Sequence, residues 1–357
     1  MKKLIALFLS LCLLLCGCTV EIVLAPEETV PPAVAVTSAP SDETLTIHYI
    51  DVGQADSILL ECGGEFMLID GGNRDDGELV VSYLQSCGVE QLKAVVCTHA
   101  HEDHVGGLPS VLAVFPVEAV YSPTNTYSSK IFDSFLYYVD QQRLELTIPA
   151  PGDKLTLGST ELTVMGPVKS YADPNNTSIV LLADFGSTRF LFTGDAEREA
   201  ENDMLDYWED RVDWNVDILK AGHHGSSTSS GYRFIYETDP EYAIVSCGKD
   251  NDYGHPHAET ISLYKDAGLP MLRTDELGSI LAVSDGQEIT ITWEKQQNVP
   301  MDLVASEGFG AFIANKNSGT LHTPFCSSLP KEANRVYYDS YESAIDAGCK
   351  PCSGCLG

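Results

Sequence analysis

The order of apolar segments along this 357-residue chain predicts an α/β protein built as an αββα sandwich, in which two β-rich halves face each other and helices cover the outside. Alternating segments at hairpin spacing, which are typical of strands, fall at 44–52, 56–61 and 66–72. Segment 77–88 then has the period of a helix. The same succession of strands and helices recurs in the second half of the chain, which predicts a second layered half.

The remaining elements follow in order. A short apolar strand is expected at 92–100 and a helix with an irregular start at 105–115. Further strands, or the ends of strands, are expected at 161–166, 178–185, 189–195, 217–226, 241–248 and 278–284. Helices are expected between them at 196–208 and 258–268.

The charge of the chain limits its partners. The sequence has 21 Lys and Arg against 52 Asp and Glu, a formal net charge of -31. A surface this acidic repels polyanions at long range, so a nucleic acid or a phosphorylated substrate would have to be held locally, by metal ions or by a few cations. With 20% charged and 44% apolar residues, the composition is that of a folded protein.

The N-terminus has the features of an export signal. Two lysines precede an apolar run at residues 4–15, which is too short for a comfortable membrane span but fits a signal peptide. The run ends in LCGC, which resembles the lipobox of bacterial lipoproteins and implies removal of residues 1–17 and lipidation of Cys18. The alternative is an ordinary secretory signal with an incidental cysteine.

A lipidated Cys18 would place the protein at the bacterial cell surface, held to the outer face of the cytoplasmic membrane by a lipid anchor alone. The segment after it, 18–43, is rich in Pro, Ala, Val and Thr and is expected to be a flexible tether. No protein partner is evident from the sequence.

The segment THAHEDHVGG, at 98–107, is a candidate metal site. On the end of an extended strand, His99 and His101 point to the same side. The turn that follows can bring Asp103 and His104 round to a neighbouring point, so that one ion takes the first pair and a second ion the next. Imidazole and carboxylate groups suit zinc, manganese or iron.

This HxHxDH pattern resembles the signature of the metallo-β-lactamase superfamily. The resemblance implies that Asp70, in LIDGG, belongs to the active site and that Asp195, in LFTGD, bridges two metal ions. It also implies that His223 or His224, in KAGHHGS, completes the second metal site. We favour His224 as the ligand and His223 as a neighbour able to touch substrate, although their spacing does not decide between them.

A closer resemblance, expected to span a domain at 44–295, is to the soluble domain of ComEC-type competence proteins. It rests on the segments IDVGQADSILL, NNTSIVLL, FTGDAE, DILKAGHHGSS and YGHP. Ala55 stands where that family usually has Gly, which should only alter a turn. Asn175 and Asn176 stand where many hydrolases of the superfamily have a histidine. The first metal ion would then have His99, His101 and Asp195, with an open position for water or a substrate oxygen.

The resemblance implies phosphodiester hydrolysis through a hydroxide held by two divalent ions, zinc or manganese. Lys220 and His255 are candidates for contacting phosphate or protonating the leaving group, but each has an equally acceptable structural reading. Gln54 and Asp56 are expected to brace the site. The candidate catalytic residues are Asp70, Asp103, Lys220, His223 and His255, and the candidate substrate-binding residues are Asn175, Asn176 and Lys220.

The C-terminus predicts a second metal site of another kind. After a linker at 296–308, the segment 309–357 is expected to form two short strands, a helix and a CxxC turn. His322, Cys326, Cys352 and Cys355 have the spacing of a tetrahedral structural zinc site. The segment resembles the zinc-binding domain of Ada-type DNA repair proteins, with His322 in place of the first cysteine, which puts methyl-accepting chemistry in doubt. The alternative is a disulfide in an exported protein.

Together these features favour a surface-anchored, metal-dependent phosphodiesterase, specifically a nuclease that acts on extracellular DNA. One alternative is a phosphodiesterase acting on choline phosphate or another cell-wall phosphate ester. A second is a DNA-capture lipoprotein without catalytic activity. The complete set of candidate metal ligands disfavours the DNA-capture reading. The balanced charges of the C-terminal segment separately weaken a DNA-binding role for that segment, since nucleic-acid-binding domains usually carry a basic patch.

Overall fold

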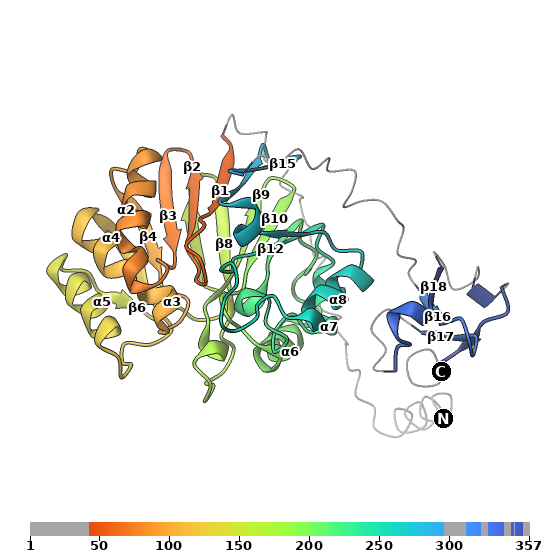
Figure 1. Cartoon of the computed structure of the whole chain (residues 1–357). Coiled ribbons are helices and arrows are strands. Elements are labelled where there is room, and N and C mark those ends of the chain that lie inside the picture. The colour runs from red at the N-terminus through yellow and green to blue at the C-terminus, as the bar shows by residue number, and fades with distance from the viewer. Residues whose placement is uncertain (1–42, 296–311, 323–327, 339–343, 346, 353–357) are drawn as a thin grey trace, which may run out of the picture. The chain divides into compact units, whose positions relative to one another are not determined.

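The computed structural model describes residues 43–295, 312–322, 328–338, 344–345 and 347–352. Cys18, with the rest of the predicted signal peptide and nearly all of the tether, lies outside the described residues, as does the predicted linker. Between 43 and 295 the chain forms two β-sheets that face each other, with helices on their outer faces (Figure 1). The predicted αββα sandwich is confirmed.

The first sheet has eight strands among the described residues. In spatial order they are β15 (Ile289–Trp293), β14 (Ile280–Ser284), β1 (Leu45–Tyr49), β2 (Ile58–Cys62), β3 (Glu65–Ile69), β4 (Leu92–Val96), β5 (Val117–Tyr121) and β6 (Leu146–Thr147). Neighbours are antiparallel from β15 to β3 and parallel from β3 to β6. Because β14 pairs with β1, the end of the domain closes onto its beginning.

The second sheet has seven strands in the described part of the chain. They are β13 (Met271–Arg273), β12 (Tyr242–Val245), β11 (Ile218–Lys220), β10 (Thr188–Phe192), β9 (Val180–Phe185), β8 (Thr160–Gly166) and β7 (Lys154–Leu157). Pairing is parallel from β13 to β10 and antiparallel from β10 to β7. Each sheet therefore has a parallel half whose strands end at the same edge.

Helices cover the outer face of each sheet. Those on the first sheet are α2 (Gly77–Ser86), α3 (Glu102–Val105), α4 (Leu108–Val114) and α5 (Lys130–Gln141). Those on the second sheet are α6 (Arg198–Tyr207), α7 (Tyr232–Thr238) and α8 (Ala258–Asp266). A short α9 (Thr274–Leu277) and the 3-10 turns η1 (Arg74–Asp76), η2 (Asn175–Thr177) and η3 (Gly222–Gly225) complete the domain. None of the helices in the described ranges is long and apolar enough to cross a membrane.

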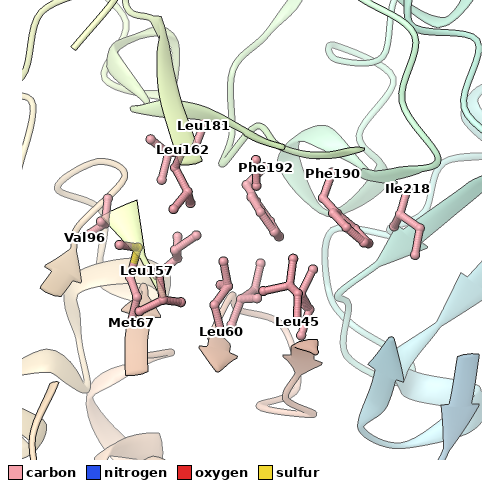
Figure 2. Close-up of a cluster of buried hydrophobic side chains, with 14 of the residues drawn as sticks. Leu45, Leu60, Met67, Val96, Leu157, Leu162, Leu181, Phe190, Phe192 and Ile218 are labelled. Atoms are coloured by element: carbon pink, nitrogen blue, oxygen red, sulfur yellow. The ribbon is translucent and has the colours of Figure 1, made fainter. Parts of the chain in front are cut away.

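The core between the sheets explains the apolar runs of the sequence. Figure 2 shows Leu45, Leu60 and Met67 of the first sheet facing Phe190 and the other labelled side chains of the second. The neighbouring side chain Leu59 is also fully buried, but it packs on the other face of the sheet, against helices. Strands buried on both faces have continuous apolar sequences instead of strict alternation.

Helix α5 is absent from the sequence-based expectations, although the sequence contained a signal for it. Phe132, Phe135 and Val139 are buried at helical spacing, and the Ser129 hydroxyl accepts a hydrogen bond from the Phe132 amide as an N-cap. The pattern is diluted by tyrosines on other faces of the helix, of which Tyr137 is 57% exposed.

The C-terminal segment forms a small sheet of its own. Its strand order is β18 (Arg335–Tyr338), β16 (Phe312–Asn315), β17 (Thr320–His322) and β19 (Lys350–Pro351). The two short strands expected in this segment correspond to β16 and β17. Its buried apolar cluster, within the described ranges, consists of small contributions from Ala314, Leu321 and Ala344. Such a small core is the kind that usually needs a metal ion or disulfides to fold.

The stability of the main domain should depend on pH through His48. Burial lowers the pKa of His48 to about 4, from 6.5, and the ring lies 3.1 Å from the Tyr83 hydroxyl. Between these pH values the unfolded chain binds a proton that the folded chain does not, so stability falls as the pH is lowered. The contribution is up to about 1.4 kcal/mol per pH unit.

To test this, unfolding by urea should be followed from pH 7 to pH 4 for the parent and for His48→Gln, which stays neutral. As the pH is lowered below 6.5, the unfolding free energy of the parent should fall relative to that of His48→Gln. A difference that is constant over this range would contradict the assignment.

Candidate metal centre

The histidine-rich turn is held in place by contacts between glycines. It follows β4 and leads into α3, and it packs against the segment after β3. The Gly71 amide donates to the His104 carbonyl at 2.8 Å, and the Gly107 amide donates to the Gly72 carbonyl at 3.2 Å. A Cβ atom on Gly107 would lie 2.0 Å from the Gly71 carbonyl oxygen. Only glycine therefore allows the two backbones to approach this closely.

The other histidines and carboxylates of the site come from the ends of parallel strands. Asp70 follows β3 and His99 follows β4, while Asp195 follows β10, His224 follows β11 and His255 follows β12. Loops at the carboxyl ends of parallel strands meet at one edge of a sheet, which is where α/β proteins commonly place their sites. The fold thereby brings these five residues, which are spread over positions 70 to 255, to one edge of the sandwich.

The turn after β11 is strained. Both His223 and His224 adopt the left-handed backbone conformation, with φ of 48° and 53°. This conformation is costly for residues with a Cβ atom and is found chiefly where function requires it. It directs the His224 ring into the buried site and leaves the His223 side chain 22% exposed beside it.

Asp195 lies at the centre of the arrangement. Its Oδ1 atom is 3.3 Å from His104 Nε2 and 3.6 Å from His224 Nε2. Its Oδ2 atom is 3.8 Å from His99 Nε2 and 3.6 Å from His223 Nε2. One carboxylate oxygen therefore faces each of two groups of histidines.

The two pairs of the HxHxDH turn occupy the two sides of this carboxylate. On one side, His99 Nε2 lies 3.1 Å from His101 Nδ1. On the other, Asp103 Oδ2 lies 3.3 Å from His224 Nε2 and 3.8 Å from His104 Nε2. The structure thus places His224, with His104, among the buried groups that face Oδ1, and places His223 at the partly exposed edge.

The donor atoms fit divalent metal ions. Ligand atoms of Asp103, His104, Asp195 and His224 all lie within 4.8 Å of one another. Three of them, His104 Nε2, Asp195 Oδ1 and His224 Nε2, are buried and have no hydrogen-bond partner among the described residues. Buried polar atoms without partners are costly, and convergent imidazole and carboxylate atoms of this kind are the usual ligands of zinc and similar ions.

The electrostatics also favour a cation. Burial by itself would lower the pKa of His224, but the charges of Asp195 and Asp56 outweigh it and raise the pKa to about 10. The pKa of His104 is likewise raised, against the effect of burial, by Asp195 and Asp70. The buried carboxylates therefore create a negative potential that either protons or metal ions can neutralise.

Asp70 lies behind His104, one of the candidate metal ligands. Its Oδ2 atom is 2.8 Å from His104 Nδ1, and both of its oxygens accept hydrogen bonds from Thr98. The carboxylate is fully buried. Asp70 was expected among the catalytic residues. Its buried position supports a different role, in which it orients His104 so that the Nε2 atom of that ring is available for a metal ion.

Lys220 has a similar supporting position. Its ammonium group is fully buried, lies 2.8 Å from Asp56 Oδ2 and donates to the Ala221 carbonyl. Asp56 Oδ1 in turn lies 3.4 Å from His224 Nδ1, which is 3.0 Å from the Ser246 carbonyl. Of the two readings of Lys220, this geometry supports the structural one, because a buried, paired ammonium is withdrawn from substrate and the pair lies against His224.

His255 lies beside the metal ligands with a defined hydrogen-bonding role. The Gly248 amide donates to Gln54 Oε1, which orients the Gln54 side-chain NH2 towards His255 Nδ1 at 3.2 Å. Burial and the neighbouring His224 and His223 lower the pKa of His255 to about 4. The ring is therefore neutral near pH 7, accepts at Nδ1 and carries its hydrogen on Nε2, where it can donate to a bound oxygen.

Asn175 and Asn176 are both buried in η2, beside the site. The Asn176 side-chain oxygen accepts from the Glu197 amide, so it fixes the loop after Asp195. The Asn175 side-chain oxygen has no hydrogen-bond partner in the described part of the chain, and it stays a candidate for substrate contact.

Two residues that support the site, Thr98 and Ser178, were not predicted from the sequence. Thr98 holds Asp70 through its amide and its hydroxyl, and the Ser178 hydroxyl accepts from the Asp195 amide and lies 3.4 Å from His99 Nδ1. Their positions next to ligand residues were visible in the sequence. Short hydroxyl side chains carry no spacing signature, so only the fold reveals their role.

The C-terminal segment brings together two of its four predicted zinc ligands. β17, which ends at His322, pairs in parallel with β19, and the Cys352 amide just after β19 donates to the Leu321 carbonyl at 2.8 Å. His322 and Cys352 are both largely buried. Cys326 and Cys355 lie outside the described residues.

Removing the charge of Asp70 should weaken metal binding without unfolding the protein. Asp70→Asn keeps the shape but replaces the carboxylate that orients His104, so metal affinity should fall about 10- to 100-fold. Chelator competition, read as metal bound per chain, measures this directly. Asp140→Asn, at an exposed position of α5, is the matched control, and equal metal affinities for the two variants would refute the role of Asp70.

The model of the metallo-beta-lactamase superfamily matches residues 50–249, more than half of the chain. The chain is 30% identical over 253 residues to ComE operon protein 3 of Bacillus subtilis, covering 66% of this chain and 32% of that protein. It is 29% identical over 238 residues to Recombination protein 2 of Haemophilus influenzae, covering 64% of this chain and 28% of that protein.

A third relative is competence protein ComA of Neisseria gonorrhoeae, 27% identical over 232 residues, with 64% of this chain and 31% of that protein covered. The chain thus spans about a third of the length of these relatives. Among solved structures, it resembles the metallo-beta-lactamase fold protein YhfI of Bacillus subtilis, at 14% identity and a TM-score of 0.47, over 68% of this chain and all of that one. On the superfamily match, this protein belongs to the metallo-beta-lactamase superfamily and has relatives among competence proteins.

Proposed function

We propose that the protein is a metal-dependent phosphodiesterase, a nuclease that acts on extracellular DNA at the bacterial cell surface. The observation that supports this most is the position of Asp195, whose two oxygens each face a separate group of histidines. A carboxylate between two ligand groups suits a pair of metal ions. Two ions, zinc or manganese, would supply Lewis acidity towards a phosphoryl oxygen and lower the pKa of water.

The ligands of such a pair are assigned from the two sides of Asp195. His99 and His101 would hold one ion and Asp103, His104 and His224 the other. Asp195 lies between them.

The partly exposed edge of the site supplies the groups that would handle substrate. His223 Nδ1 lies 3.3 Å from Glu197 and from the Thr228 hydroxyl, and its Nε2 atom points towards Asp195. Glu197 can thus hold the imidazole so that it donates a proton to a leaving oxygen. Next to it, the Nε2–H group of His255 can donate a hydrogen bond to a phosphoryl oxygen.

The choice of DNA draws on the relatives. Three of them carry names that refer to competence or recombination. An acidic chain needs local cations to hold a polyanion, and a two-metal site would provide them. Attachment through Cys18, as proposed from the LCGC segment, would place the site outside the cytoplasmic membrane.

Loss of the central carboxylate should abolish hydrolysis. We expect Asp195→Ala to keep the fold but to lose metal ions and at least about a thousandfold in turnover, because both ligand groups depend on it. The purified, metal-loaded protein should be incubated with single- and double-stranded DNA, RNA and bis-p-nitrophenyl phosphate, with Asp140→Ala as the control.

Each result of this panel has a defined meaning. Turnover by Asp195→Ala at the parent's rate, with metal content unchanged, would contradict the bridging role. Cleavage of the small diester without any nucleic acid would remove the nuclease proposal. It would favour a phosphate ester such as a choline phosphate derivative instead.

We also propose that the C-terminal segment binds one structural zinc ion through His322, Cys326, Cys352 and Cys355. The support for this is that His322, the last residue of β17, and Cys352, the residue just after β19, lie at adjacent ends of two paired strands. Cys349 is three residues from Cys352 but is not in the proposed set, so it provides a matched control.

Cys352→Ser should lower the zinc content by one ion per chain and unfold the segment, since metal binding supplies much of the folding free energy of small metal domains. The main domain should melt at nearly the parent temperature. Cys349→Ser should retain the ion. Zinc analysis and calorimetry measure both, and a loss of zinc in Cys349→Ser but not in Cys352→Ser would overturn the ligand set.

A further inference from the structure

Tyr253 is an exposed aromatic ring directly beside the candidate metal centre. The side chain is 69% exposed, although tyrosine rings usually bury much of their surface. One face of the ring stacks on His255, with centroids 5.6 Å apart and planes inclined by 22°. His255 in turn stacks on the buried ligand His224 at 6.3 Å and lies 5.5 Å from His223.

The loop that carries Tyr253 is rigidly built. The Asn251 side chain accepts from the His255 amide at 3.0 Å and donates to the Gly248 and His255 carbonyls. His257 Nε2 lies 3.1 Å from the Tyr253 carbonyl, and its Nδ1 atom accepts from the Ser227 amide in the loop after the histidine pair. The backbone that carries the ring is therefore held in place, and stacking on His255 positions the ring itself, which lowers the entropy cost of binding.

The surroundings of Tyr253 disfavour a site for many phosphates. Asp250 and Asp252 lie exposed in the same loop with one exposed lysine, Lys249, so the loop has a net negative charge, and the chain as a whole carries a net charge of -31. A duplex is bound mainly through phosphate contacts from cationic side chains. Base stacking on an aromatic ring, in contrast, requires no cation and accepts any base.

On these grounds we propose that Tyr253 stacks an unpaired nucleobase next to the scissile phosphodiester, which makes single-stranded nucleic acid the preferred substrate. This inference rests on the proposed phosphodiesterase function. The exposed face of Tyr253 would receive the base, because His255 covers the other face. A single flat face suits a planar base better than a quaternary ammonium group, which is usually enclosed by several aromatic rings.

The test compares the full-length parent with Tyr253→Ala and Tyr253→Phe, and with Tyr137→Ala on α5 as a matched exposed tyrosine. Substrates are a short single-stranded oligonucleotide, the same strand with abasic sites around the cleaved bond, the corresponding duplex, and p-nitrophenyl phosphorylcholine. Binding without cleavage is also measured, by fluorescence polarisation of the same metal-loaded proteins with a single strand whose scissile linkages are non-hydrolysable methylene phosphonates.

For the single strand, Tyr253→Ala should raise KM about tenfold or more and weaken binding in parallel, with kcat and metal content close to the parent's. Tyr253→Phe and Tyr137→Ala should resemble the parent, since both variants keep an aromatic ring at position 253. The abasic strand should not distinguish any of these proteins. The parent should cleave the duplex less efficiently than the single strand.

The other outcomes separate the two proposals. If the parent cleaves DNA but Tyr253→Ala has the parent's KM for the intact strand, or if the duplex is preferred, the stacking inference is overturned and the nuclease function stands. If Tyr253→Ala impairs only p-nitrophenyl phosphorylcholine, the ring binds a quaternary ammonium group instead. If the parent cleaves no nucleic acid, the proposed function fails and the inference fails with it.

Discussion

The carboxylate of Asp195 is the constraint on which the site depends. It is buried, its two oxygens face separate groups of histidines, and Oδ1 has no hydrogen-bond partner among the described residues. Enclosing a carboxylate with unpaired imidazole nitrogen atoms is costly unless cations neutralise the charge. The cost becomes understandable if cations occupy the spaces on both sides. The raised pKa values of His104 and His224 reflect the same unbalanced negative charge.

The rest of the fold holds this arrangement in place. Parallel strands of both sheets end at the site, so residues far apart in sequence meet there. The glycine contact between Gly71 and Gly107 fixes the histidine turn, and the left-handed backbone after β11 places one histidine inside and one at the edge. Behind them, Asp70 holds His104 and the Asp56–Lys220 pair lies against His224. The candidate ligands are thus oriented by a second layer of buried polar groups, as metal centres generally require.

Much of this was predictable from short motifs. HxHxDH placed four candidate ligands on one turn, and the apolar segments around it indicated the strands that position Asp195 and His224. The roles of Asp70 and Lys220 were not predictable, because a motif identifies a charged residue near the site without indicating which way its side chain points. Both point into the protein, and burial with a charged partner decides their role. Helix α5 was not predicted, because exposed tyrosines obscure its buried stripe. Tyr253 begins the YGHP segment, but a lone tyrosine in a loop has no signature that would indicate a role.

The central claim is that metal ions bind on both sides of Asp195. Anomalous X-ray diffraction from crystals of the full-length protein grown with Mn²⁺ or Zn²⁺, recorded at the edge of each metal, tests it most directly. The account predicts two anomalous peaks in the main domain, one bounded by His99, His101 and Asp195, the other by Asp103, His104, Asp195 and His224. Peaks found only elsewhere in the main domain, with the nitrogen atoms of His104 and His224 unliganded at saturating metal, would contradict it.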